Sequence, residues 1–114
     1  MTDSLKDLSQ RQHEFALQRG WIPLNSPKNL ACALMVEAAE LLEHFQWMKE
    51  ADSFTLPPDT HHAVSTEMAD VLIYLVQLGN VLGIDVVQAA HDKIALNARK
   101  YPVPGDDPAP ATQG

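Results

Sequence analysis

The chain has few of the residues on which several common protein chemistries depend. Its 114 residues include a single cysteine, Cys32, and no CxxC or HExxH spacing that would predict a zinc site. Neither a glycine-rich phosphate loop nor a Ser-His-Asp arrangement occurs. The sequence therefore gives no support to zinc-, thiol- or serine-based catalysis, and we interpret Cys32 as a small buried side chain in a reducing compartment.

Basic residues and long apolar runs are also scarce. Eight lysines and arginines stand against 15 aspartates and glutamates, a formal charge of -7, which argues against nucleic acid or an anionic membrane as the main partner. No apolar run approaches the ~18 residues of a membrane span, and the N-terminus lacks the pattern of a signal peptide. We therefore expect a cytoplasmic protein without a nucleic-acid or membrane partner.

The periodicity of apolar residues predicts a single all-α domain. Helical spacing recurs in four segments, at about 3–19, 27–49, 60–82 and 86–101. Gly20 and Gly83 are placed to end helices, Ser26 to begin one, and Asp85 to begin another with Gln88 as its capping-box partner. We expect a four-helix bundle over residues 1–101 and a disordered proline-rich tail over residues 102–114.

The two central segments contain paired carboxylates. Glu37-Ala-Ala-Glu40 and Glu67-Met-Ala-Asp70 are separated by 26 residues. On a helix, a spacing of three places both acids of a pair on one face. At ~5 Å and an effective dielectric constant of ~20, each like-charged pair costs roughly 3 kcal/mol, so a positive charge should lie between them. Carboxylate oxygens without cysteine, and without the Glu-x-x-His motifs of di-iron bundles, favour Mg²⁺, with Mn²⁺ as a second candidate.

Two polar stripes leave alternatives open. In the last segment, Lys93, Asn97 and Lys100 share one helical stripe, which is either a solvated face or a phosphate clamp beside a metal site. In the first segment, Gln12 and Arg19 lie on the apolar line, either as boundary residues of the core or as groups that face a polar pocket.

The order of these motifs resembles the MazG-like all-α nucleoside triphosphate pyrophosphohydrolases, and within them the small dCTP pyrophosphatases. The resemblance rests on EFALQRGW, SPKNLACALMVEAAELLEHFQW, EMADVLIYL and KIALNARKYP, nearly the whole chain to Pro102. It implies three groups of site residues: the magnesium ligands and catalytic acids Glu37, Glu40, Glu67 and Asp70; the phosphate-binding residues Lys93, Asn97 and Lys100; and the base-binding residues Gln12, Phe15, Trp21, Trp47 and Tyr74.

Two positions depart from the family pattern. Relatives often have a histidine where this chain has Gln12, with His13 one place on, so the base preference stays open. Many relatives have arginine before Tyr-Pro, where this chain has Lys100, and a point charge does not replace a bidentate fork without loss.

The resemblance implies hydrolysis of a nucleoside triphosphate, with dCTP or a modified dCTP favoured, to the monophosphate and pyrophosphate. A carboxylate of the cluster would accept the proton of the attacking water. Two alternatives remain: a non-catalytic nucleotide- or metal-binding module, and a helical interaction domain with solvated acids. Wide apolar arcs on the second and third segments, together with the resemblance, predict a homodimer or homotetramer that completes the bundle.

Overall fold

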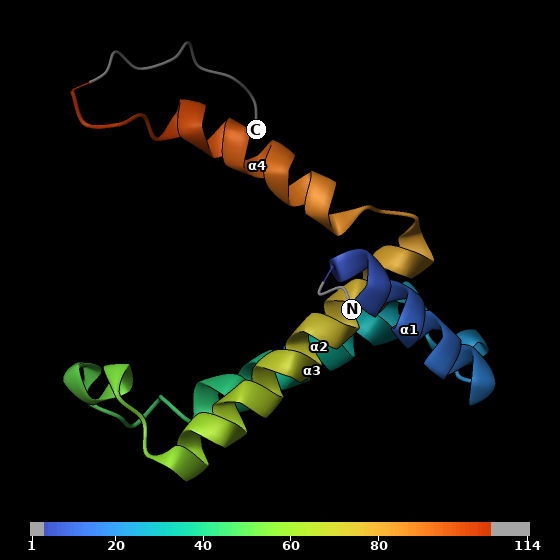
Figure 1. The fold of residues 1–114 in the computed structure, drawn as a ribbon, viewed down its shortest axis with the longest axis horizontal. Helices are drawn as coiled ribbons and strands as arrows, with labels where there is room; N and C mark the ends of the chain where they lie inside the picture. Colours follow the sequence, from blue (N-terminus) through green and yellow to red (C-terminus); the bar gives the residue numbers. More distant parts are fainter. Residues whose placement is uncertain (1–3, 106–114) are drawn as a thin grey trace. The chain divides into compact units, whose positions relative to one another are not determined.

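The computed structural model describes residues 4–105 and confirms the all-α class, with no strand in that range (Figure 1). The elements in chain order are α1 (Leu5–Gln18), the 3-10 helix η1 (Ile22–Leu24), α2 (Pro27–Glu43), the 3-10 helix η2 (Glu50–Phe54), α3 (Pro58–Leu82) and α4 (Val86–Lys100). The described part divides into two compact units, one up to Gly83 and one from Ile84 onward, so α4 is described by itself. A single domain over residues 1–101 stays a prediction.

Hydrogen-bonding side chains begin α2 and α4 where the sequence predicts. The Ser26 hydroxyl accepts a hydrogen bond from the backbone N–H of Asn29 at 3.1 Å, and the Asp85 carboxylate accepts one from Gln88 N–H at 3.0 Å. The predicted capping box at Asp85 is wrong in its second half. The Gln88 amide donates to Asp92 one turn further along, at 2.9 Å, because that carboxylate is a charged acceptor within reach.

Glycines end α1 and α3 as predicted. Gly20 and Gly83 both have a φ of 67°, a left-handed conformation that costs a side-chain-bearing residue energy and that stops helix propagation. The predicted tail over residues 102–114 lies mostly outside the described residues, of which 102–105 are not helical.

The end of α2 differs from the prediction. The helix stops at Glu43, six residues before the expected Lys49. Beyond it the backbone tightens into turns, in which Phe45 N–H donates to Leu42 O and Met48 N–H donates to Phe45 O, both at 2.9 Å. Residues after Glu43 therefore lie in turns outside α2, although Gln46 N–H still donates to Leu42 O at 2.9 Å.

In the unit that ends at Gly83, α2 and α3 lie side by side and α1 packs against α3 (Figure 1). The buried apolar side chains come from all three helices: Ala16, Leu30, Val64 and Val76. A polar contact also joins α1 to α3, because the Ser9 hydroxyl donates to the Asn80 side chain and the Asn80 amide donates to Ser9 O. This three-helix packing positions the acids of α2 and α3.

The outer face of α2 is more exposed than expected. Cys32 is exposed, so its interpretation as a buried thiol is wrong. Met35 and Val36, about one turn further along the same face, are 69% and 56% exposed. The apolar arc of α2 is wider than the surface that α3 covers, which leaves this face in contact with solvent.

No single helix between residues 4 and 105 is both long and apolar enough to cross a membrane. Only α3 and α4 taken together, with the break between them, have the length and composition of a membrane span.

Candidate functional site

The two acidic pairs meet where α2 lies beside α3. Glu37 on α2 and Glu67 and Asp70 on α3 each offer a carboxylate oxygen, and these oxygens lie within 4.8 Å of one another. All three side chains are partly buried. One oxygen of Glu37 and one of Glu67, both Oε2, are buried and have no hydrogen-bond partner. Buried acceptors of this kind are costly unless a donor or a cation satisfies them.

The pKa of Glu37 shows that Glu40, the fourth predicted acid, also lies close to the cluster. The pKa of Glu37 is raised from 4.5 to about 7, first by burial and then by the adjacent Glu40 carboxyl, with further contributions from Asp70 and Glu67. Every side chain that contributes to this shift is itself an acid. The other three predicted acids therefore all lie within electrostatic reach of Glu37, and without a cation Glu37 retains a proton up to near neutral pH.

The residues present fit a divalent metal ion. The cluster offers hard oxygen donors from two helices, and its two buried oxygens lack a protein donor. Mg²⁺ and Mn²⁺ prefer such carboxylate ligands. A bound dication would also offset the burial and the neighbouring negative charges that together raise the pKa of Glu37.

Two of the predicted base-binding residues lie together at the end of α1. The rings of Phe15 and Trp21 meet edge to face, with their centroids 5.6 Å apart at an interplanar angle of 65°. The Arg19 guanidinium lies 3.4 Å above the Phe15 ring, and its Nη1 donates to Phe15 O at 3.2 Å. Both rings remain 42% exposed, so they leave aromatic surface available for a ligand.

The other three predicted base-binding residues lie elsewhere on the unit. Tyr74 is partly buried one turn after Asp70 on α3, and Gln12 is partly buried on α1. Trp47 is 90% exposed in the turns beyond α2. The expected alignment of Trp47 with the acids along one continuous helix is wrong, because α2 ends at Glu43. A contact between Trp47 and a base stays a prediction.

The predicted phosphate-binding residues are all on α4. Lys93 and Lys100 are exposed and Asn97 is partly buried. Helical spacing keeps the three on one stripe of α4. Their role in phosphate binding stays a prediction.

Sequence reasoning missed the partner of one buried polar residue. Gln77, which follows Asp70 and Tyr74 on the same edge of α3, is 8% exposed. Its Oε1 accepts a hydrogen bond from Asn25 Nδ2 at 3.0 Å. The two residues are 52 positions apart, and no local pattern indicates that pairing.

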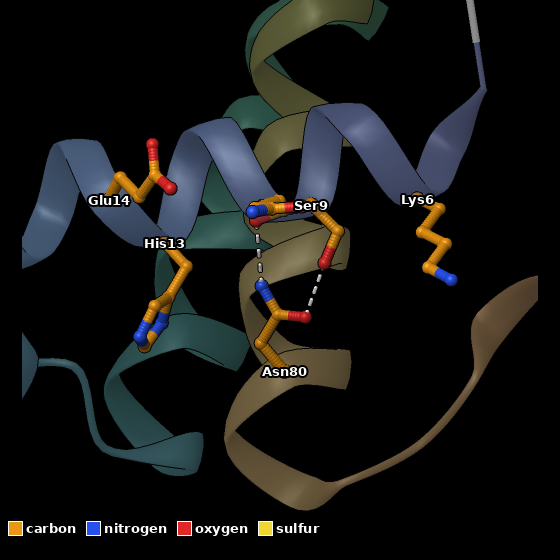
Figure 2. Close-up of a pocket in the computed structure, with 6 residues that line it drawn as sticks. Lys6, Ser9, His13, Glu14 and Asn80 are labelled. Atoms are coloured by element: carbon orange, nitrogen blue, oxygen red, sulfur yellow. Dashed lines mark hydrogen bonds between the residues drawn. The ribbon is translucent and has the colours of Figure 1, made fainter.

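A hollow of about 450 Å³ lies between α1 and the end of α3 (Figure 2). All the residues that line it are of polar or charged types: Lys6, Ser9, Gln10, His13, Glu14 and Asn80. None of the four acids and neither ring of the aromatic pair lines it. His13, the sequence neighbour of Gln12, therefore faces this hollow rather than the aromatic pair.

Comparisons with known proteins point to one family. The model of the MazG-like family matches residues 32–110. The dCTP pyrophosphatase 1 of Mus musculus is 38% identical over 102 residues, and that of Homo sapiens is 37% identical over 101 residues. These alignments cover 88% and 87% of this chain, which spans only 60% and 59% of the length of the two relatives. A crystal structure of a pyrophosphatase from Archaeoglobus fulgidus is 38% identical, with a TM-score of 0.82 over 90% of this chain and 96% of that chain.

The raised pKa of Glu37 predicts how the stability of the metal-free protein depends on pH. Between pH 4.5 and 7 the folded chain keeps a proton that the unfolded chain releases, so the free energy of unfolding should fall as the pH rises through this window. The fall should be at most roughly 2–3 kcal/mol, because solvent screens a group that is only partly buried, and urea unfolding in the presence of a chelator at pH 5 and pH 8 measures it.

Glu37→Gln should remove most of that fall, because it removes the titrating group. Glu43→Gln, at an exposed acid where α2 ends, is the matched control and should keep the wild-type dependence. An equal fall in the free energy of unfolding between pH 5 and pH 8 in wild type and in Glu37→Gln would show that another group causes the pH dependence.

Proposed function

The chain belongs to the MazG-like family, and we propose that it is a Mg²⁺-dependent nucleoside triphosphate pyrophosphohydrolase. The favoured substrate is dCTP or a modified dCTP, in keeping with the relatives named dCTP pyrophosphatase 1. The observation that carries the proposal is the convergence of Glu37, Glu67 and Asp70 with two buried, unpartnered oxygens. We place the protein in the cytoplasm, where the exposed Cys32 stays reduced.

The proposed reaction breaks the α–β phosphoanhydride bond with water and releases a monophosphate and pyrophosphate. Glu37, Glu67 and Asp70 would hold the divalent cation, together with Glu40. When bound, the cation supplies charge neutralisation at the phosphates and lowers the pKa of a coordinated water. A carboxylate of the cluster would act as the general base that accepts the proton of the attacking water.

The geometry of α3 supports a base site at Phe15 and Trp21. The bond between Asn25 and Gln77 ties the loop that contains Trp21 to α3, seven residues after Asp70. At a rise of 1.5 Å per residue this is about 10 Å along the helix axis, comparable to the distance from a triphosphate to its base. We therefore propose that the nucleotide lies along α3, with its phosphates at the acids and its base towards Trp21.

The remaining contacts are proposed by position in the family pattern. Trp47, Tyr74 and Gln12 would complete the base site, and Lys93, Asn97 and Lys100 would bind the phosphates. Stacking on aromatic rings does not read base identity, so a polar group such as the Gln12 amide would have to select the base.

A panel of nucleoside triphosphates, incubated with Mg²⁺ and analysed for products, tests the proposal. We expect a monophosphate and pyrophosphate in equal amounts, with dCTP or a modified dCTP among the best substrates. Asp70→Ala and Glu40→Ala should each lower turnover roughly a thousandfold or more, because each removes charge from the metal site. Their helical circular dichroism should match wild type, since losing one of several repelling charges does not destabilise the fold.

Asp59→Ala, at an exposed acid in the first turn of α3, is the matched control and should keep wild-type activity. Near-normal activity in Asp70→Ala would refute the assignment of the site. Saturable nucleotide binding without release of pyrophosphate would identify a non-catalytic binding module instead.

Trp47 provides a separate test of the base site. Trp47→Ala should raise the KM for the best nucleotide at least tenfold with a smaller effect on kcat, because one stacked ring contributes ~1–3 kcal/mol. Its 90% exposure means that the substitution should leave the thermal midpoint unchanged. Phe54→Ala, at an aromatic residue that is 85% exposed, is the control and should leave KM unaltered.

Gln12→Ala should change the ranking among bases more than the overall rate. An unchanged KM in Trp47→Ala would remove Trp47 from the base site, and an unchanged ranking in Gln12→Ala would remove Gln12 from base selection.

We also propose that the protein is a homodimer or homotetramer. Besides Met35 and Val36 on α2, exposed apolar residues on α3 include Met68, Leu72 and Leu75, which are 57%, 40% and 40% exposed. A second copy would remove such surfaces from water. Light scattering at micromolar concentration should give at least twice the monomer mass of 12.6 kDa, and the monomer mass itself would contradict this proposal.

A further inference from the structure

The loop between α1 and α2 is held at both ends by hydrogen bonds to its backbone. Trp21 N–H donates to Ala16 O at 3.0 Å, which anchors the start of the loop to a buried residue of α1. The Asn29 side chain donates to Leu24 O at 3.0 Å, which anchors its end to the first turn of α2. These bonds fix the loop to α1 and α2, but neither joins it to the helix that contains Glu67 and Asp70.

The bond from Asn25 Nδ2 to Gln77 Oε1 supplies that connection, at 3.0 Å in a partly buried setting. Gln77 lies on the same face of α3 as Asp70, because an interval of seven residues returns to within about 20° of the same direction on a helix, and Glu67 lies about 80° to one side of it. The loop that contains Trp21 is thus tied to the acidic face of α3 through one side-chain pair.

From this arrangement we infer that Gln77 is a positioning residue, which fixes Trp21 relative to the metal-binding acids through its bond to Asn25. The inference rests on the proposed function and assigns Gln77 no contact with the nucleotide or the metal. Its role is to hold the base site at a set distance from the phosphate site.

The chemistry of the amide suits this role. A side chain that is 92% buried and polar costs desolvation energy unless it is hydrogen-bonded, and an apolar residue would fill the same space without that cost. A carboxylate would also accept the bond from Asn25, but it would add a negative charge on the face that already contains Glu67 and Asp70. An amide oxygen accepts the bond without adding that charge.

Loss of the bond should loosen the loop rather than the metal site. The Trp21 ring would sample more positions and bind the base less well, whereas the acids keep their places on α2 and α3. Gln77→Met, which keeps the shape and removes the acceptor, should raise the KM for dCTP about fivefold and leave kcat within about twofold. Asn25→Leu should do the same, and the double variant should be no worse than either single variant.

A fluorescence measurement reports the loop itself, independently of activity. The chain contains two tryptophans, so Trp47→Phe leaves Trp21 as the sole tryptophan, whose emission selective excitation reports. In this background and without nucleotide, Gln77→Met should raise acrylamide quenching of Trp21. Gln77→Glu, which keeps an acceptor for Asn25, should restore the quenching of the parent protein.

Asn80→Leu is the matched control. It breaks another polar contact between α3 and its neighbours, the one with Ser9 on α1, and should change neither the quenching of Trp21 nor the KM. Unchanged quenching in Gln77→Met would overturn the inference, and so would a fall in kcat with an unchanged KM.

The proposed function and the inference fail in different ways. If the wild-type protein releases no pyrophosphate from any nucleotide, the proposed function is refuted. The inference then survives only if Gln77→Met both increases quenching of Trp21 and weakens the binding of dCTP in the presence of Mg²⁺, and it falls if either effect is missing.

Discussion

Repulsion among carboxylates is the constraint on which the rest of this structure depends. The packing of α2 against α3 brings Glu37, Glu67 and Asp70 within 4.8 Å of one another and leaves two of their oxygens buried without a partner. Without a cation Glu37 keeps a proton up to near neutral pH, because its burial first and the neighbouring acids second raise its pKa to about 7. A divalent cation would neutralise the cluster with greater charge, which is why we propose a metal site here.

The helix α3 connects this cluster to the proposed base site. It contains two of the acids, and further along the same face it contains Gln77, which binds the loop of Trp21 through Asn25. Because a helix is stiff, a contact at one point on its face sets the distance to groups elsewhere on that face. Recognition of the base and of the phosphates would thus depend on one rigid element.

Local signals allowed much of the fold to be predicted from the sequence. Gly83 and Ser26 mark helix ends because their conformation or hydroxyl acts within one turn, and both are confirmed. The end of α2 was missed because residues after Glu43 keep an apolar pattern while their backbone tightens into turns. Cys32 was expected inside because periodicity shows which face is apolar, but not how much of it a neighbour covers.

For the candidate site too, local features could be predicted from the sequence and long-range contacts could not. The spacing within each acidic pair indicates a shared helix face. The meeting of the two pairs depends on how α2 packs on α3, which the family resemblance suggested. The bond between Asn25 and Gln77 joins residues 52 positions apart and has no sequence pattern, so only the structure shows it.

Calorimetric titration of Mg²⁺ into the metal-free protein at pH 7, repeated in buffers of different ionisation enthalpy, tests the metal site most directly. We predict saturable binding that releases protons, because a cation displaces the proton held near Glu37. Glu67→Gln should weaken binding strongly. Absence of saturable binding, or wild-type affinity in Glu67→Gln, would contradict the assignment of these acids as a metal site.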